Sequence, residues 1–420
     1  MNVDILLGLQ WGDEGKGKIV DALSPGYDVV ARFQGGPNAG HSLEFNSVKH
    51  VLHLIPSGIF HSDKLNLIGS GVVLDPAVFR KEVETLGFSI DEVKKRLLIS
   101  KKTHLILPGH RILDAAYECS KGSTKIGSTL KGIGPAYTDK TARNGLRVGD
   151  ILRNNFTELY RKALDYHLSI ASHYDFKFDL AEYENGWFDG IDLLHQFTLV
   201  NSEYLVHDLI HNGKKILAEG AQGTMLDVDF GSYPFVTSSN TVSAGACTGL
   251  GISPGQIGDV FGIFKAYCTR VGSGPFPTEL NDETGEMIRK TGAEFGSTTG
   301  RPRRCGWLDM PALKYAIMIN GVTQLLMTKA DVLSGFSRVK ICTSYRINGV
   351  QTIELPFEND VAIEPVYIEM EGWNEDISSV RKYEDLPVTL RDFVNFIEKE
   401  TGIPITMVSV GPDRKESVFR

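Results

Sequence analysis

The sequence lacks the features that mark membrane, secreted and nucleic-acid-binding proteins. Its 420 residues contain no apolar run of the roughly 18 residues that a membrane helix needs, and its first residues lack the basic start of a signal peptide. Lysine and arginine total 44 against 52 acidic residues, which gives a net charge of −8. Because nucleic-acid backbones require a basic face, we expect no nucleic acid as a partner. Because no apolar run is long enough for a membrane helix, we also expect no membrane partner.

Cysteine is also scarce. The five cysteines, at positions 119, 247, 268, 305 and 342, are scattered, odd in number and form no C-x-x-C pair. This usage predicts reduced thiols and a cytoplasmic protein. Cys305 stands beside an arginine cluster that would lower its pKa, but no partnered base is evident, so a nucleophilic role is not favoured.

The first strong pattern follows the first apolar run. Val3–Leu7 reads as a buried strand and leads into the glycine-rich stretch Gly8–Lys18. Within it, G-x-x-x-x-G-K is followed by Ile19, where a phosphate-binding loop has the Ser or Thr that binds magnesium. Either no nucleotide binds, or another oxygen holds the metal, with Asp13 the obvious substitute. The glycines, lysines and acids favour phosphate binding over a plain strand-to-helix turn.

Two more polar loops follow predicted strands. Tyr27–Phe33 leads into Gln34–Ser42, which contains His41, and Lys215–Glu219 leads into Gly220–Asp227. Because the second glycine loop stands at a strand end so close to the first, we expect these two loops to line one site. The Gly220–Asp227 loop has polar side chains between glycines, again at a strand end. A histidine in a turn rich in glycine and asparagine, without apolar neighbours, favours a functional role over a solvent-facing one.

Two stretches have anion-binding composition. Ser120–Gly149 is rich in Gly, Ser, Thr and Lys without periodicity, so it is a linker or a mobile binding loop, and the hydroxyl and lysine content favours the loop. A short helix is predicted to begin at Asp139–Arg143. The arginines of Ser297–Arg304 are either a solvated charge run or an anion-binding loop, and the flanking hydroxyl residues favour the second.

The C-terminal part supplies a candidate base reader. The predicted strand Thr323–Thr328 ends in Lys329-Ala330-Asp331, a K-x-D triplet in which the aspartate can accept hydrogen bonds from guanine N1–H and N2–H₂. A last strand, Ile405–Val408, ends in the turn Ser409-Val410-Gly411. The triplet alone is weak, but an upstream phosphate loop makes it a credible guanine site.

Helix formers and aromatic residues dominate residues 151–213, which we expect to form a helical insertion packed beside the sheet. Its aromatic stripe is expected to be core. Length alone suggests two or three domains, but the candidate site pieces extend from residue 12 to residue 411. We therefore predict a single catalytic domain over residues 1–420.

Together these motifs resemble the adenylosuccinate synthetase family over essentially the whole chain. The specific pieces are QWGDEGKGK, GGPNAGHS, STKIGSTLKGIGPAYTDKTAR, EGAQGTMLDVDFGSYPFVTSSNT, STTGRPRRCGW, TKADV and SVGP. Pro37, Ser42 and Ala330 depart from the usual family residues, but none of them removes a chemical group that the reaction needs.

The resemblance implies a fold and a reaction. The fold is α/β, with a large central mostly parallel sheet, flanking helices and a phosphate-loop-like N-terminus, in a homodimer to which Arg143 contributes across the interface. The reaction is the GTP-dependent, Mg²⁺-assisted ligation of L-aspartate to IMP in AMP biosynthesis, which yields adenylosuccinate, GDP and phosphate through 6-phosphoryl-IMP. A 6-oxo group leaves poorly and phosphate leaves well, which explains the need for GTP.

The resemblance also implies residue roles. Asp13 is similar to the general base for IMP, His41 to the acid that helps GDP leave, Gln222 to the residue that orients the purine 6-oxygen, and Lys16 to a source of positive charge. Asp13 and the Gly40 carbonyl correspond to metal ligands. The implied IMP contacts are Asp13, Glu14, Gly15, Lys16, Asn38, Ala39, Gly40, His41, Thr129, Arg143, Gln222, Thr237 and Arg301. The implied GTP contacts are Gly12, Asp13, Glu14, Gly15, Lys16, Gly17, Lys18, Gly40, His41, Ser42, Arg303, Lys329, Ala330, Asp331, Ser409, Val410 and Gly411. The implied aspartate contacts are Ser297, Thr298, Thr299, Gly300, Arg301, Pro302 and Arg303.

Two other classes compete with this interpretation. A non-catalytic guanine-nucleotide switch explains the phosphate loop and the K-x-D triplet, but it leaves His41 and the arginine loop without a purpose. A nicotinamide dehydrogenase requires G-x-G-x-x-G, whereas the first loop has G-x-x-G-x-G.

Overall fold

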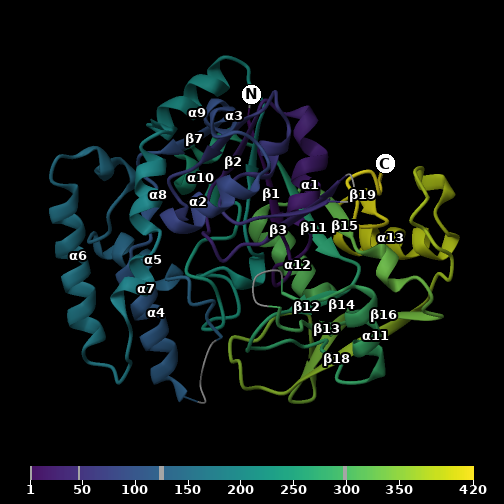
Figure 1. The fold of residues 1–420 in the computed structure, drawn as a ribbon. Coiled ribbons are helices and arrows are strands. Elements are labelled where there is room, and N and C mark those ends of the chain that lie inside the picture. Colours follow the sequence, from purple (N-terminus) through teal and green to yellow (C-terminus); the bar gives the residue numbers. More distant parts are fainter. Residues whose placement is uncertain (1, 46–47, 123–126, 297–299) are drawn as a thin grey trace.

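The computed structural model describes residues 2–45, 48–122, 127–296 and 300–420. In this part of the chain the fold is built on a central sheet in which all neighbouring strands run parallel except the last pair (Figure 1). Its ten strands, from one edge to the other, are β20 (Ser417–Phe419), β19 (Ile405–Ser409), β15 (Gln324–Thr328), β11 (Ile257–Lys265), β1 (Val3–Gly8), β10 (Ile216–Glu219), β2 (Val29–Arg32), β5 (Leu65–Ile68), β7 (Leu97–Ser100) and β9 (Thr198–Val200). The predicted α/β class with a large, mostly parallel sheet is confirmed.

β1 lies in the middle of the sheet, between β10 and β11. Its residues Val3, Ile5, Leu6 and Leu7 are almost completely buried, because helices and loops cover both faces of a parallel sheet. A continuous apolar run is what such a strand requires. The turn that follows β1 therefore opens at the centre of the sheet's carboxyl edge.

The helices surround the sheet, and several of them begin at residues that the sequence marks clearly. The Asp75 side chain accepts the backbone N–H groups of Ala77 and Val78, and Ser89 with Glu92 forms a capping box. The described helices are α1 (Lys16–Leu23), α2 (Pro76–Thr85), α3 (Ile90–Arg96), α4 (Pro108–Ser120), α5 (Ile133–Ala142), α6 (Phe156–Ala171), α7 (Leu180–Glu184), α8 (Trp187–Leu194), α9 (Ser202–His211), α10 (Ala244–Leu250), α11 (Glu283–Thr291), α12 (Met310–Asn320) and α13 (Val388–Thr401). Among these described helices, none combines the length and apolarity that crossing a bilayer requires.

The insertion at residues 151–213 is helical only in part. It contains α6, α7, α8 and α9, but β9 pairs with β7 and forms the edge of the central sheet. The expectation of a purely helical segment is therefore wrong at β9. The aromatic stripe is core as predicted, since Phe156 and Tyr160 are buried and the Tyr160 ring stacks on Trp187. In Figure 1, α4 to α7 form a group of helices at one side of the molecule.

The helix expected to begin near Asp139 is α5, which begins at Ile133 and has almost ended there. Gly132, in a left-handed conformation, precedes its first turn, and Arg143 in the same conformation ends it. The prediction of an irregular stretch from Ser120 to Gly149 is therefore wrong over α5. Residues 123–126 of that stretch lie outside the described residues.

The smaller sheets lie outside the central one. A mixed sheet contains β14 (Leu308–Asp309), β16 (Arg338–Ile347), β17 (Val350–Thr352) and β18 (Ile363–Glu371), in which β14 runs parallel to β16 while β17 and β18 run antiparallel to it. Three strand pairs complete the described set: β12 (Cys268–Arg270) with β13 (Arg304–Gly306), β3 (His41–Phe45) with β4 (Val48–Leu52), and β6 (Val73–Leu74) with β8 (His104–Leu105). Figure 1 shows β16 and β18 beside α11, away from the helical group.

Candidate active site

The loops that follow β1, β2 and β10 contact one another at the carboxyl edge of the sheet. A Cβ atom at Gly17 would lie 2.9 Å from His41 Cβ, and one at Gly35 would lie 2.9 Å from the Ala221 Cβ. Gly223 lies still closer to the first loop, since its Cβ would stand 2.4 Å from the Gln10 carbonyl oxygen. The expectation that the first two loops meet is confirmed, and the Gly220–Asp227 loop joins them. Glycine is what permits their approach.

The first loop is folded around a buried carboxylate. Glu14 is fully buried, and its Oε1 accepts the backbone N–H groups of Gln10 at 3.2 Å and Gly12 at 2.9 Å. Its other oxygen pairs with the ammonium of Lys16, which is also buried. Asp13 adopts a positive φ of 61° between these contacts. The loop therefore holds its own shape, with Glu14 inside it and Asp13 turned partly to solvent.

Asp13 is joined through Arg303 to the predicted aspartate-binding segment and to the buried carboxylate of Glu294. Arg303 Nε donates to Asp13 Oδ2 at 2.8 Å, and its NH1 group donates to Glu294 Oε2 at 2.6 Å. Glu294 also accepts from Lys265 Nζ at 2.8 and 2.9 Å. Burial alone would raise the pKa of Glu294, but the charges of Lys265 and Arg303 hold it at about 2.

His41 is oriented by a second buried carboxylate. The ring is 4% exposed, and its Nδ1 atom bonds Glu219 Oε1. Burial, followed by the charge of Arg32, lowers the pKa of His41 to about 4, although Glu219 opposes the shift. At neutral pH the imidazole is therefore neutral, with its proton on Nδ1 toward Glu219 and a lone pair on Nε2.

Several buried polar atoms around these loops have no hydrogen-bond partner. They are Asn38 Oδ1, both amide atoms of Gln222, His41 Nε2 and all three nitrogens of the Arg32 guanidinium group. Buried polar atoms in folded proteins are normally paired, so such a group of orphans fits a polar ligand between the loops. Asn38, His41 and Gln222 are predicted site residues, and the structure places them on loops that touch.

The predicted guanine pocket is linked to the phosphate loop by Lys18. β15 and β19 are neighbours in the sheet, so the K-x-D triplet and the Ser409–Gly411 turn lie at one edge. Lys18 Nζ donates to Ser409 Oγ at 2.8 Å, to the Gly411 carbonyl at 2.5 Å and to the Glu416 carbonyl at 2.9 Å. These contacts use the three donors of the ammonium group. Burial raises the pKa of Asp331, and Lys329 opposes that shift.

The remaining predicted residues lie around the periphery. Thr129 and Thr237 are half-buried, whereas Arg301 is exposed, with its NH1 atom 3.7 Å from a Cβ built at Gly127. Arg143 is exposed at the end of α5, where a second chain can reach it. Ser297, Thr298 and Thr299 lie outside the described residues.

Three charged residues around the site were not predicted from the sequence: Arg32, Glu219 and Glu294. Arg32 and Glu219 each end a short apolar run, Val-Val-Ala-Arg and Ile-Leu-Ala-Glu, and the strands align them in register. A charged residue at the end of a buried strand is the signal that would have found both. Glu294 follows a helix in an unremarkable stretch, and nothing in the sequence distinguishes it.

Two other features do not form part of this site. In the described residues one group with metal-ligand chemistry is His110, Asp139 and His167. Leu107 N–H donates to His110 Nδ1, which leaves the proton of the neutral ring on Nε2, facing Asp139 at 2.9 Å. The group is therefore a hydrogen-bonded cluster. The expected lowering of the Cys305 pKa is wrong, because burial raises it to about 11.

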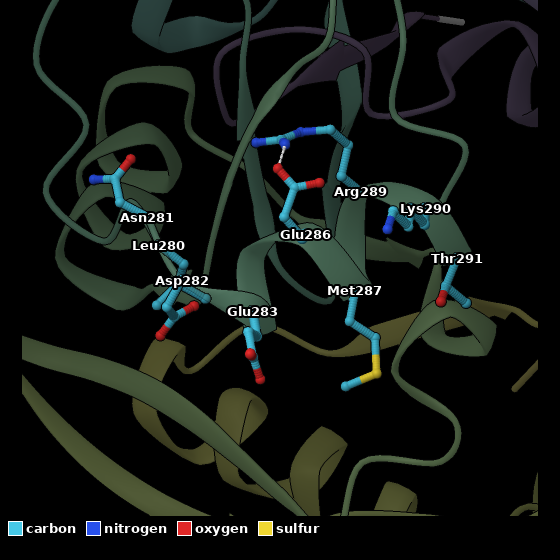
Figure 2. A pocket seen from close by; sticks show the side chains of 9 residues that line it. All are labelled: Leu280, Asn281, Asp282, Glu283, Glu286, Met287, Arg289, Lys290 and Thr291. Atoms are coloured by element: carbon cyan, nitrogen blue, oxygen red, sulfur yellow. Dashed lines mark hydrogen bonds and ion pairs between the residues drawn. The ribbon is translucent and has the colours of Figure 1, made fainter.

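A surface hollow lies along α11, at a distance from the loops described above. Figure 2 shows Glu286 and Arg289, neighbours on α11, pointing toward each other, while Met287 points away from this pair. The hollow is lined by Leu280, Asn281, Asp282, Glu283, Glu286, Met287, Arg289, Lys290 and Thr291. None of these is a predicted site residue, but Arg289 Nε also donates to the Arg303 carbonyl at 2.8 Å and so supports the arginine that holds Asp13.

Comparisons with known proteins agree with this geometry. The family model described as adenylosuccinate synthetase matches residues 5–418. The chain is 59% identical to the adenylosuccinate synthetase of Parabacteroides distasonis over 420 residues, covering 100% of this chain and 99% of that protein. It is 60% identical to that of Flavobacterium johnsoniae, covering 100% of both chains.

Solved structures give the same result. The fully ligated adenylosuccinate synthetase of Plasmodium falciparum superposes with a TM-score of 0.95 at 38% identity, covering 100% of both chains. The succinoaminodeoxyadenylate synthetase of cyanophage S-2L, at 20% identity and a TM-score of 0.66, covers 100% of this chain and 95% of its own and shares the fold.

The burial of His41 predicts a pH-dependent stability. Its folded pKa of about 4 lies below the ordinary 6.5, so the unfolded chain binds more protons between these values. The free energy of unfolding must therefore fall as the pH drops from about 6.5 to 4, with a His41 contribution on the order of 2–3 kcal/mol. Urea unfolding across this range should show a shallower fall for His41→Asn than for wild type. His173→Asn, at an exposed position, is the matched control, and equal slopes for wild type and His41→Asn would contradict the prediction.

Proposed function

The chain belongs to the adenylosuccinate synthetase family, and we propose that it joins L-aspartate to IMP with GTP as the energy source. The products are adenylosuccinate, GDP and phosphate. The observation that carries the proposal is the contact between the phosphate loop and the His41 and Gln222 loops, on an edge that also bears the K-x-D triplet. Family membership offers no support for a non-catalytic nucleotide switch.

In the first half-reaction, Asp13 removes the N1 proton of IMP and the 6-oxygen attacks the γ-phosphate of GTP. The bond from the γ-phosphorus to the β–γ bridging oxygen breaks, and GDP leaves. Phosphoryl transfer depends mainly on positioning and charge neutralisation. Asp13 suits the base because it is partly exposed and Arg303 holds only its Oδ2 atom.

His41 and Gln222 assist this step. Gln222 has an unpartnered amide group that can hold the 6-oxygen of IMP. The neutral His41 must gain a proton at Nε2 to donate to the leaving oxygen, and the negative charge of a bound triphosphate raises the pKa of a neighbouring imidazole. In the second half-reaction the aspartate amine attacks C6, loses a proton and expels phosphate.

The donor set suits Mg²⁺. Ile19 offers no hydroxyl, but the Asp13 carboxylate and the Gly40 carbonyl are the hard oxygen ligands that this ion prefers, together with phosphate oxygens. When bound, the ion supplies positive charge to the transferring phosphoryl group. Arg303 must share or release Asp13 for this, since it occupies Oδ2 in the structure.

The binding roles implied by the family complete the proposal. Asn38, Thr129, Thr237 and Arg301 contact IMP, residues 297–303 hold aspartate, and Lys329, Asp331 and the Ser409–Gly411 turn hold guanine. All of these belong to one catalytic domain over residues 1–420. Two such chains form a homodimer, with Arg143 contributed to the neighbour's site. The five cysteines form no disulfide, which supports a cytoplasmic location.

The central test is substrate dependence. The purified protein should form adenylosuccinate when IMP, L-aspartate, GTP and Mg²⁺ are all present, and omission of any one substrate should abolish the product. A chromatographic assay of adenylosuccinate and GDP measures both products. GTP hydrolysis that ignores IMP and aspartate would favour a nucleotide switch instead.

Guanine recognition makes a second prediction. Asp331→Asn should weaken the binding of GTP and favour that of xanthosine triphosphate. The 2-oxo group of xanthine accepts a hydrogen bond where the 2-amino group of guanine donates one. Unpaired polar groups in such a site can shift preference by roughly 10⁴-fold. The ratio of kcat/KM for the two nucleotides measures the change. If the variant kept the wild-type preference for GTP over xanthosine triphosphate, the guanine pocket would have to lie elsewhere in the chain.

The shared site makes a third prediction. Asp13→Ala and Arg143→Ala homodimers should both be nearly inactive. After subunit exchange, about half of the dimers are heterodimers, each with one doubly altered site and one intact site, so about a quarter of all sites should recover. Activity against mixing ratio measures this. A flat curve, with exchange confirmed by labelled subunits, would mean that Arg143 serves its own chain.

A further inference from the structure

Glu219 lies beneath the proposed catalytic histidine, at the carboxyl end of β10. The strand register places it beside Leu6 of β1 and Arg32 of β2, at the centre of the sheet. It is 0% exposed, so its side chain has no route to solvent. A carboxylate in such a place is stable only when nearby groups satisfy it.

Its hydrogen bonds are directed to two segments, the start of β3 at His41 and the short helical turn Ser57–Phe60. Oε1 accepts from His41 Nδ1 and from Ser57 Oγ at 2.7 Å, and Oε2 accepts the Ser57 backbone N–H at 2.8 Å. Both oxygens are therefore engaged by the protein. Glu219 cannot also bind a substrate group, and its remaining influence on the reaction passes through His41.

We propose that Glu219 is the positioning residue of His41: it fixes the ring proton on Nδ1 and aims Nε2 at the nucleotide. This rests on the proposed function, in which His41 donates to the leaving oxygen. A carboxylate that orients an imidazole and stabilises the imidazolium is an established catalytic device.

The charges around His41 explain why this carboxylate is needed. Arg32 from β2 and Lys16 from α1 both disfavour a protonated His41, while Glu219 from β10 favours it. Arg32 is fully buried with no hydrogen-bond partner, so its charge is screened only weakly. Burial alone would raise the pKa of Glu219, but its bond from His41, the His41 and Arg32 charges and the Ser57 N–H lower it, so it stays ionised.

Glu219→Gln keeps the shape and removes the charge. We expect kcat to fall by about 10²–10⁴-fold, as for loss of a general acid, with little change in KM for GTP or IMP. The split between kcat and KM carries the sharper test, because a variant that merely disturbed the fold would weaken substrate binding as well.

Glu82→Gln is the matched control. Glu82 is another buried glutamate whose charge acts on Arg32, but its oxygens accept the N–H groups of residues 53–55 and do not contact His41. Its kcat should stay near the wild-type value. Glu219→Asp, which restores the carboxylate, should recover part of the lost kcat. An unchanged kcat in Glu219→Gln, or an equal loss in Glu82→Gln, would overturn the proposal.

A measurement on the unaltered protein keeps the proposal testable if a variant does not fold. In ¹H–¹⁵N spectra without nucleotide at neutral pH, the His41 ring should carry its proton on Nδ1, with the signals identified by their loss in His41→Asn. A proton on Nε2 instead would refute the inference. The tautomer does not depend on turnover, so a failure to make adenylosuccinate with the expected tautomer would count against the proposed function alone.

Discussion

The site depends on the close approach of three backbone loops, which side chains at the points of contact would prevent. Three loops leave adjacent parallel strands, and the sheet brings their first residues within a few ångströms because neighbouring strands lie about 4.8 Å apart. A Cβ atom at Gly8 would stand 2.2 Å from Glu14 Oε2, and one at Gly223 would stand 2.6 Å from the Gly12 nitrogen. Glycine at these positions lets Glu14 enter the first loop and bind its backbone. The glycine pattern is thus a packing requirement as well as a phosphate-binding signature.

The same edge of the sheet concentrates buried charge, and each charge has a defined counterpart. Glu14 pairs with Lys16, Glu219 with His41, and Glu294 with Lys265 and Arg303. Taking such groups out of water costs several kcal/mol per ion, so pairs of this kind seldom arise for stability alone. They hold functional side chains in fixed directions. Arg32 is the exception, because its guanidinium group has the charge of Glu219 nearby but no hydrogen bond.

The sequence was most informative where local patterns repeat in space. Apolar runs followed by glycine loops predicted the strands β1, β2 and β10 and the meeting of the first two loops, because the carboxyl ends of parallel strands lie at one edge. The pattern failed where pairing is decided at long range. β9 joins the central sheet although it lies within a mainly helical segment. β16 pairs with β18 although a loop and the strand β17 separate them in the sequence. No local spacing encodes such partners.

The predicted site was limited in the same way. Residues on loops, such as Asp13 and Asn38, have exposed or polar neighbours in the sequence that mark them as functional. Arg32 and Glu219 sit inside apolar strands, where their significance comes only from the register that places them side by side. Glu294 acquires its importance from Lys265, which is distant in the chain and contributed by β11. Such residues support the visible motifs, and they become recognisable only once the strands are aligned.

The proposed subsites are also physically connected. Lys18 belongs to the phosphate loop and donates hydrogen bonds to the turn that is proposed to bind guanine. Arg303 belongs to the segment that is proposed to bind aspartate, and it donates to Asp13, the proposed general base. A ligand that accepts a hydrogen bond from Lys18 or Arg303 therefore changes the hydrogen bonds of a neighbouring subsite. Binding at one place therefore alters the electrostatic balance at the next. The proposed subsites for the three substrates therefore share the same few charges along one edge of the sheet.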